Sequence, residues 1–81
     1  MTLTVHLFAR VRELAGADTV SVELPAAATV ADLRRALADR FPPLAGLLER
    51  SAIAVNHEFA PSSQAIEPDI EVSVIPPVSG G

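Results

Sequence analysis

The sequence predicts an α+β fold, in which one amphipathic helix covers one face of a small sheet. Apolar and polar residues alternate with a period of two near both ends of the chain, as in half-buried strands. Between them, residues 30–37 carry apolar side chains at three- and four-residue spacing, which is typical of a helix. With 81 residues, 49% of them hydrophobic and 20% charged, the chain is the size of one packed domain.

The first two strands are expected at residues 3–8 and 19–24. In the first of these runs Leu3, Val5 and Leu7 alternate with Thr4, His6 and Phe8. The link between the two runs can hold a short helical turn that ends at Gly16, and its length suits an antiparallel pair.

The main helix is expected to begin at Thr29 or Val30. The Thr29 hydroxyl and the acid three residues later, Asp32, resemble a capping box. The arginines at 34, 35 and 40 fall on the solvated face or its flanks, and Phe41-Pro42-Pro43 ends the helix. A weaker helical stretch follows over residues 44–48.

Two more strands are expected in the C-terminal half. Residues 53–55 form a short strand, Asn56-His57 its turn, and Phe59 lies near a loop. The last strand covers residues 70–75 and ends at Pro76-Pro77, since proline cannot donate to a ladder. We therefore divide the chain into a folded domain, residues 1–75, and a C-terminal tail, residues 76–81.

Composition excludes several classes of function. The net charge of −4 disfavours nucleic acid and anionic membranes as partners, because binding them needs clustered basic residues. Without cysteine there is no disulfide, thiolate metal site or cysteine nucleophile. His6 and His57 are too far apart in sequence for a local metal pair, so no metal is expected. No signal peptide or membrane span is recognisable, and we expect a cytoplasmic protein with a protein partner.

The outward positions of the strands carry apolar residues that the core does not need. Phe8 and Ile75 point away from the helix if their neighbours point towards it, and with Phe59 they could form one exposed patch. Such a patch is typical of a partner site, although single exposed apolar residues are common.

The tail ends in Gly80-Gly81 behind two stiffening prolines. Six extended residues reach roughly 20 Å, and glycines without Cβ atoms can enter a narrow tunnel. A terminal carboxylate, with a pKa of about 3.5, is ionised and must be activated before a nucleophile attacks it. The sequence also lacks lysine; this is either compositional chance or a protection against acylation of its own side chains.

Four segments together resemble the small subunits of molybdopterin synthase: residues 7–16, 54–56, 71–72 and 76–81, which read LFARVRELAG, AVN, EV and PPVSGG. The resemblance implies a ubiquitin-like β-grasp fold and a role as a sulfur carrier without a catalytic pocket of its own. A ubiquitin-activating-type adenylyltransferase would use ATP to adenylate the Gly81 carboxylate. Sulfur transfer would then give a thiocarboxylate, with no cofactor bound to the chain.

The resemblance also implies the partner and its contacts. The tail would enter the large subunit of molybdopterin synthase, in a heterotetramer, and give sulfur to cyclic pyranopterin monophosphate. Gly81 would bear the sulfur, and the residues that thread with it would be Gly80, Ser79, Val78 and Pro77. Partner contacts would come from Phe8, Arg12, Phe59 and Ile75. One departure is Asp69, which stands where family members often have a turn glycine, and which would need a left-handed backbone.

Three alternatives stay open from sequence. A carrier for thiazole or another sulfur-containing product would share the fold and the diglycine. A protein modifier would conjugate Gly81 to lysines, as ubiquitin does. A plain binding module would use the face around Phe8 and Ile75 alone.

Overall fold

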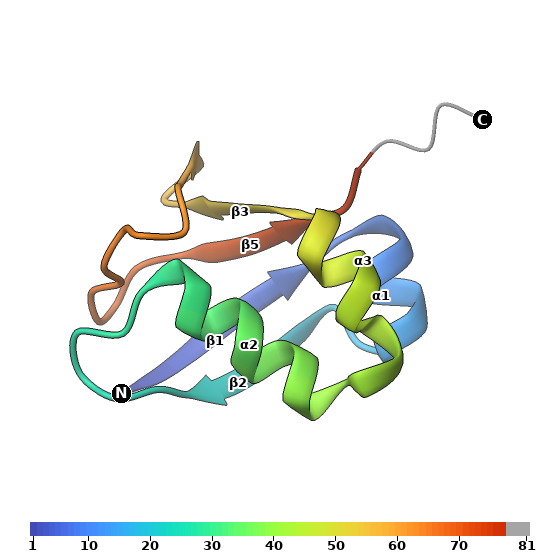
Figure 1. Cartoon of the computed structure of the whole chain (residues 1–81), viewed down its shortest axis with the longest axis horizontal. Helices are drawn as coiled ribbons and strands as arrows, with labels where there is room; N and C mark the ends of the chain where they lie inside the picture. Colours follow the sequence, from blue (N-terminus) through green and yellow to red (C-terminus); the bar gives the residue numbers. More distant parts are fainter. Residues whose placement is uncertain (78–81) are drawn as a thin grey trace.

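The computed structural model describes residues 1–77, so the predicted tail residues Val78, Ser79, Gly80 and Gly81 lie outside the described part. Residues 1–77 form a five-stranded sheet with the order β2-β1-β5-β3-β4. The strands are β1 (Thr2–Leu7), β2 (Thr19–Glu23), β3 (Ala52–Val55), β4 (Glu58–Phe59) and β5 (Val72–Ile75). The helices are α1 (Ala9–Ala15), α2 (Val30–Arg40), the short 3₁₀ helix η1 (Pro42–Leu44) and α3 (Ala45–Arg50). Helices α2 and α3 cover one face of the sheet, which we call the inner face (Figure 1).

The N-terminal hairpin forms as predicted. β1 and β2 are antiparallel, with Leu3 opposite Val22 and Val5 opposite Val20, and all four side chains are buried. Between the strands, α1 ends at Gly16, whose φ of 75° is left-handed and favours glycine. The predicted helical turn is thus a full short helix.

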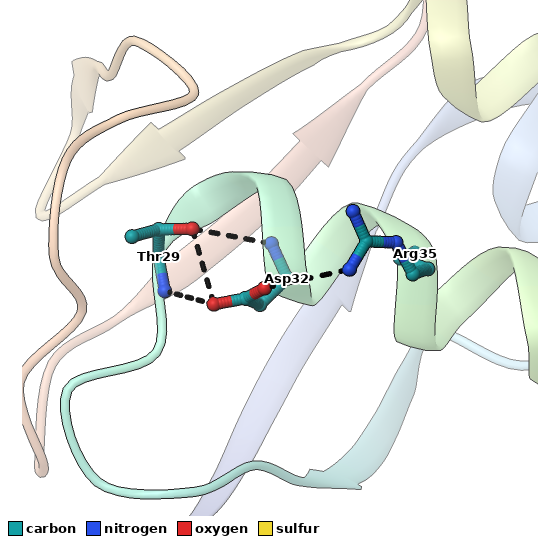
Figure 2. Close-up of polar contacts among 3 residues, drawn as sticks. All are labelled: Thr29, Asp32 and Arg35. Carbon is teal, nitrogen blue, oxygen red and sulfur yellow. Dashed lines mark hydrogen bonds and ion pairs between the residues drawn. The ribbon is translucent and has the colours of Figure 1, made fainter.

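Helix α2 begins with the predicted capping box. The Thr29 backbone N–H donates to Asp32 Oδ2 over 2.9 Å, and the Asp32 N–H donates to the Thr29 hydroxyl over 3.3 Å (Figure 2). The hydrogen bond from the Thr29 backbone lowers the pKa of Asp32 from its ordinary value, with smaller contributions from the Thr29 hydroxyl and from the Arg35 charge, 3.7 Å away. The box fixes where the helix starts and therefore which of its faces meets the sheet.

The apolar stripe of α2 packs on the inner face of the sheet. Val30 and Leu33 are fully buried, as are Val5 and Val72 on the strands beneath. Arg34, predicted on the solvated face or its flanks, is half-buried and donates to the carbonyls of Leu48 and Ser51, over 2.5 and 2.6 Å. Arg34 thereby binds two carbonyl groups at the C-terminal end of α3, and the Leu48 carbonyl also accepts from the Ser51 N–H.

The C-terminal half completes a mixed sheet. β5 is parallel to β1, and β3 is antiparallel to β5 and to β4. The turn between β3 and β4 has both central residues left-handed, Asn56 with φ 50° and His57 with φ 69°. The two residues thus form a tight hairpin without the Asn-Gly pair that such turns prefer.

One prediction about this half is wrong: Ile70 is not part of the last strand, which starts at Val72. Phe59, predicted near a loop, is the last residue of the short edge strand β4, where the tight turn pairs it directly with Ala54. Asp69, with φ 63°, turns the chain, and Glu71 exchanges hydrogen bonds with Asn56 before the ladder begins. The left-handed backbone expected at Asp69 is therefore present.

The strand order, the parallel central pair and the helix across one face are the β-grasp arrangement, so the predicted α+β fold is confirmed. Within residues 1–77, no helix has the length and apolar character needed to cross a membrane.

Candidate partner-docking surface

The outer face of the sheet, opposite α2 and α3, presents the apolar residues predicted to bind a partner. Leu7 pairs with Val74, and both are buried on the inner face. Phe8, which follows β1 with an extended backbone, and Ile75, the last residue of β5, therefore face outward side by side. Their exposed fractions, 47% and 37%, confirm that they do not belong to the core.

Phe59 joins these residues through two alanines of β3. Ala52 is opposite Ile75, and Ala54 is opposite both Ser73 and Phe59. Phe59 is 74% exposed. We call the residues Phe8, Ile75, Ala52, Ala54 and Phe59 the sheet patch; small side chains in its middle leave the larger ones standing at its two ends.

The sheet patch adjoins the point where the chain leaves the sheet. Ile75 is the last residue of β5, Pro76 after it is buried and Pro77 is exposed. This end of β5 lies beside α1 (Figure 1). A protein that covers the sheet patch would therefore also meet the start of the predicted tail. Gly81 and the three residues before it lie outside the described residues.

Arg12, the other predicted contact, is exposed on α1 and forms an ion pair with Asp18 over 3.7 Å. It is not on the sheet, so the structure does not place it in the sheet patch. Leu14, which is half exposed on the same helix, likewise lies outside the sheet patch.

The structure brings together three side chains that the sequence left apart. His57 Nε2 lies 2.8 Å from Glu71 Oε2, and His6 Nε2 lies 3.6 Å from Glu71 Oε1. Only a known register of β1 beside β5, together with the tight turn at His57, could have revealed this histidine–glutamate cluster. Nowhere in residues 1–77 are three or more His, Cys, Asp or Glu side chains arranged to hold a metal ion.

The cluster is on the outer face, next to the sheet patch. His6 pairs with Ser73, and Ser73 lies in the row that ends at Phe59. Glu71 precedes Ser73 by two residues, so it lies about 7 Å further along the same face. A hollow lined by Thr4, His6, Asp69 and Glu71 opens there.

Comparison with known proteins places this surface in a family. The sequence matches the ThiS family over residues 5–81. It is 40% identical to the molybdopterin synthase sulfur carrier subunit of Dictyostelium discoideum over 80 residues, covering 95% of this chain and 93% of the relative. The crystal structure of SAMP1 from Haloferax volcanii superposes with a TM-score of 0.86, at 31% identity and with full coverage of both chains.

A more distant structure shares the fold alone. It is the complex of subunits 1 and 2 of molybdopterin-converting factor from Helicobacter pylori, in which the matching chain has a TM-score of 0.69 at 23% identity, with both chains fully covered. The sheet order, the helix packing and these superpositions define a ubiquitin-like β-grasp protein. The chain belongs to the ThiS family. Within it, the chain is similar to the sulfur carrier subunits of molybdopterin synthase along nearly its whole length.

Proposed function

We propose that this chain is the sulfur carrier subunit of a molybdopterin synthase and that Gly81 bears the sulfur as a C-terminal thiocarboxylate. The observation that carries the proposal is the 40% identity, over 95% of the chain, to a molybdopterin synthase sulfur carrier subunit. The Gly80-Gly81 pair at the end of the sequence supplies the group on which such a carrier would act.

The chemistry needs an enzyme on another chain. The Gly81 carboxylate would attack the α-phosphate of ATP to form an acyl-adenylate and release pyrophosphate. A sulfur nucleophile would then displace AMP and leave sulfur in place of one carboxylate oxygen. Because an ionised carboxylate is a poor electrophile, activation must precede sulfur transfer. An adenylyltransferase of the ubiquitin-activating type fits that step.

The partner that accepts the sulfur would be the large synthase subunit, in a heterotetramer. The Helicobacter pylori relative is found with its own second subunit, which supports a complex of this kind. We assign the sheet patch, and Arg12 on α1, to that contact. The threading residues Pro77, Val78, Ser79 and Gly80 would carry Gly81 into the partner's pocket, where cyclic pyranopterin monophosphate would receive the sulfur.

A reconstituted reaction tests the proposal. The thiocarboxylated chain, mixed with the large subunit and the pterin precursor, should yield molybdopterin, whereas a chain that lacks Gly81 should yield none. The same deletion should leave binding to the large subunit measurable, because the sheet patch remains intact. Full activity without Gly81 would point instead to a plain binding module.

Growth of a deletion strain distinguishes this role from that of a carrier for thiazole synthesis. A strain without this chain should fail where a molybdoenzyme is required and should grow normally without added thiamine. A thiamine requirement would assign the carrier to thiazole synthesis instead.

A second candidate function is protein modification, favoured by the superposition on SAMP1, a small archaeal modifier protein. In that role the activated Gly81 would form amide bonds with lysines of other proteins. Adducts that survive denaturant and reductant on many unrelated proteins would support it. One adduct, to the large subunit alone, would instead fit a stalled sulfur transfer.

A further inference from the structure

Basic residues are confined to the helices of this domain, which also carry Glu13, Asp32, Asp39 and Glu49. All six arginines lie on helices: Arg10 and Arg12 on α1, Arg34, Arg35 and Arg40 on α2, and Arg50 on α3. By contrast, the outer face of the sheet carries carboxylates and histidines, with Glu23 at the β2 edge and Glu71 near its middle. Charge complementarity therefore favours a basic partner surface over this face.

Glu71 is the carboxylate that such a partner would meet beside the sheet patch. It is 44% exposed and lies two residues before Ser73, in whose row Phe59 also lies. A standard interface covers about 800 Å² on each partner, roughly 28 Å across, whereas Glu71 is only about 14 Å from Ile75 along the strand. A partner seated on the sheet patch would therefore also cover Glu71.

His57 is held beside Glu71 at a conformational cost. Its φ of 69° is left-handed, and the turn that it occupies prefers glycine at this position. Two hydrogen bonds join the turn to the Glu71 backbone. The Asn56 N–H donates to the Glu71 carbonyl over 2.8 Å, and the Glu71 N–H donates to Asn56 Oδ1 over 3.1 Å. Strain of this kind often accompanies function.

We infer that Glu71 binds a basic side chain of the partner protein and that His6 and His57 make this contact dependent on pH. The inference rests on the proposed function, because it concerns the partner that docks on the sheet patch. With neutral imidazoles, Glu71 presents a free negative charge to an incoming arginine or lysine. When the imidazoles are protonated, they neutralise Glu71 and repel the same cation, so the complex weakens as pH falls.

The other charged groups near the cluster do not reverse this sign. Asp69 lines the same hollow as His6 and Glu71, and it adds negative charge. Glu58 and Glu67 line a different hollow beside the hairpin. All three are carboxylates, which attract a cation as Glu71 does.

Binding of the large subunit to four chains, measured at pH 8 and pH 6, tests the inference: the unaltered chain, Glu71→Gln, the double variant His6→Gln with His57→Gln, and Glu23→Gln. Glu23 is a matched control, since it is on the same face but at the far edge, without a histidine partner. At pH 8 we expect Glu71→Gln to weaken binding about tenfold, as the loss of a charged hydrogen bond does, and Glu23→Gln to leave it unchanged.

The pH series distinguishes the effect of the two histidines on binding from the effect of groups that titrate on the partner. Binding of the unaltered chain should weaken more between pH 8 and pH 6 than that of Glu71→Gln. The double histidine variant should keep the affinity at pH 8 and lose this extra pH dependence. Equal pH dependence in the unaltered chain and Glu71→Gln, or an equal loss of affinity in Glu23→Gln, would overturn the inference. If sulfur transfer by the unaltered chain is still observed, only the inference about Glu71 fails. If sulfur transfer is also absent, the proposed function is wrong.

Discussion

Replacing Phe59 by alanine is the sharpest test of the sheet patch as a docking surface. Phe59 lies on the edge strand β4, and 74% of its surface is exposed, the largest fraction among the exposed large apolar residues of the described chain. A partner that covers the sheet patch would bury most of that surface. The substitution leaves the buried core of the domain untouched.

The expected loss of affinity follows from the exposed fraction. Fully burying a phenylalanine side chain contributes about 1.5–3 kcal/mol. Since about three quarters of Phe59 remains to be buried, its removal should cost about 1–2 kcal/mol of binding free energy, or roughly fivefold to thirtyfold in Kd. The free energy of unfolding of Phe59→Ala should stay within about 0.5 kcal/mol of the unaltered chain's, as is usual for surface substitutions.

Calorimetric titration of the large subunit measures this effect directly. Leu14→Ala is the matched control, because Leu14 is also an exposed apolar residue, 50% accessible, but on α1 rather than on the sheet. We expect Leu14→Ala to leave Kd within about twofold, an effect below 0.5 kcal/mol. Undiminished binding by Phe59→Ala, or an equal loss in Leu14→Ala, would refute the assignment of the sheet patch.

Three further predictions concern stability. Thr29→Ala removes the capping hydroxyl and should lower the free energy of unfolding by about 1 kcal/mol in urea titrations, an effect that an unchanged midpoint would contradict. The pKa of Asp32 is lowered in the folded chain, so the stability that its carboxylate contributes is complete above the ordinary value of 3.8 and is lost as pH falls through the lower folded value. Asp32→Asn should flatten this part of the plot of unfolding free energy against pH, whereas an identical plot would rule out the contribution. Gly16→Ala should destabilise by about 1–2 kcal/mol through its left-handed φ alone, since no atom within 4 Å would meet the added Cβ, and full stability would show that this backbone is not strained.

Local signals in the sequence were enough to locate most elements. The capping box at Thr29 set the start of α2, and alternation showed that Phe8 and Ile75 face away from the core. These features depend on residues close together in the chain, where spacing and side-chain chemistry act directly.

The sequence did not predict contacts that depend on how segments meet. Phe59 lies in a strand because the hairpin accepts Asn56-His57 in place of the preferred turn residues. Arg34 found acceptors at the end of another helix. Similarly, His6 and Glu71 face each other because β1 and β5 are neighbours in space, although almost the whole chain separates them in sequence.

The central claim is that Gly81 carries sulfur, and the intact mass of the protein tests it most directly. The purified chain would be incubated with ATP, the activating enzyme and a sulfur donor, with a chain lacking Gly81 treated in parallel. We predict a mass gain that corresponds to one terminal oxygen replaced by sulfur, in the unaltered chain only. An unchanged mass, with an activating enzyme shown to be competent on another carrier, would contradict the account.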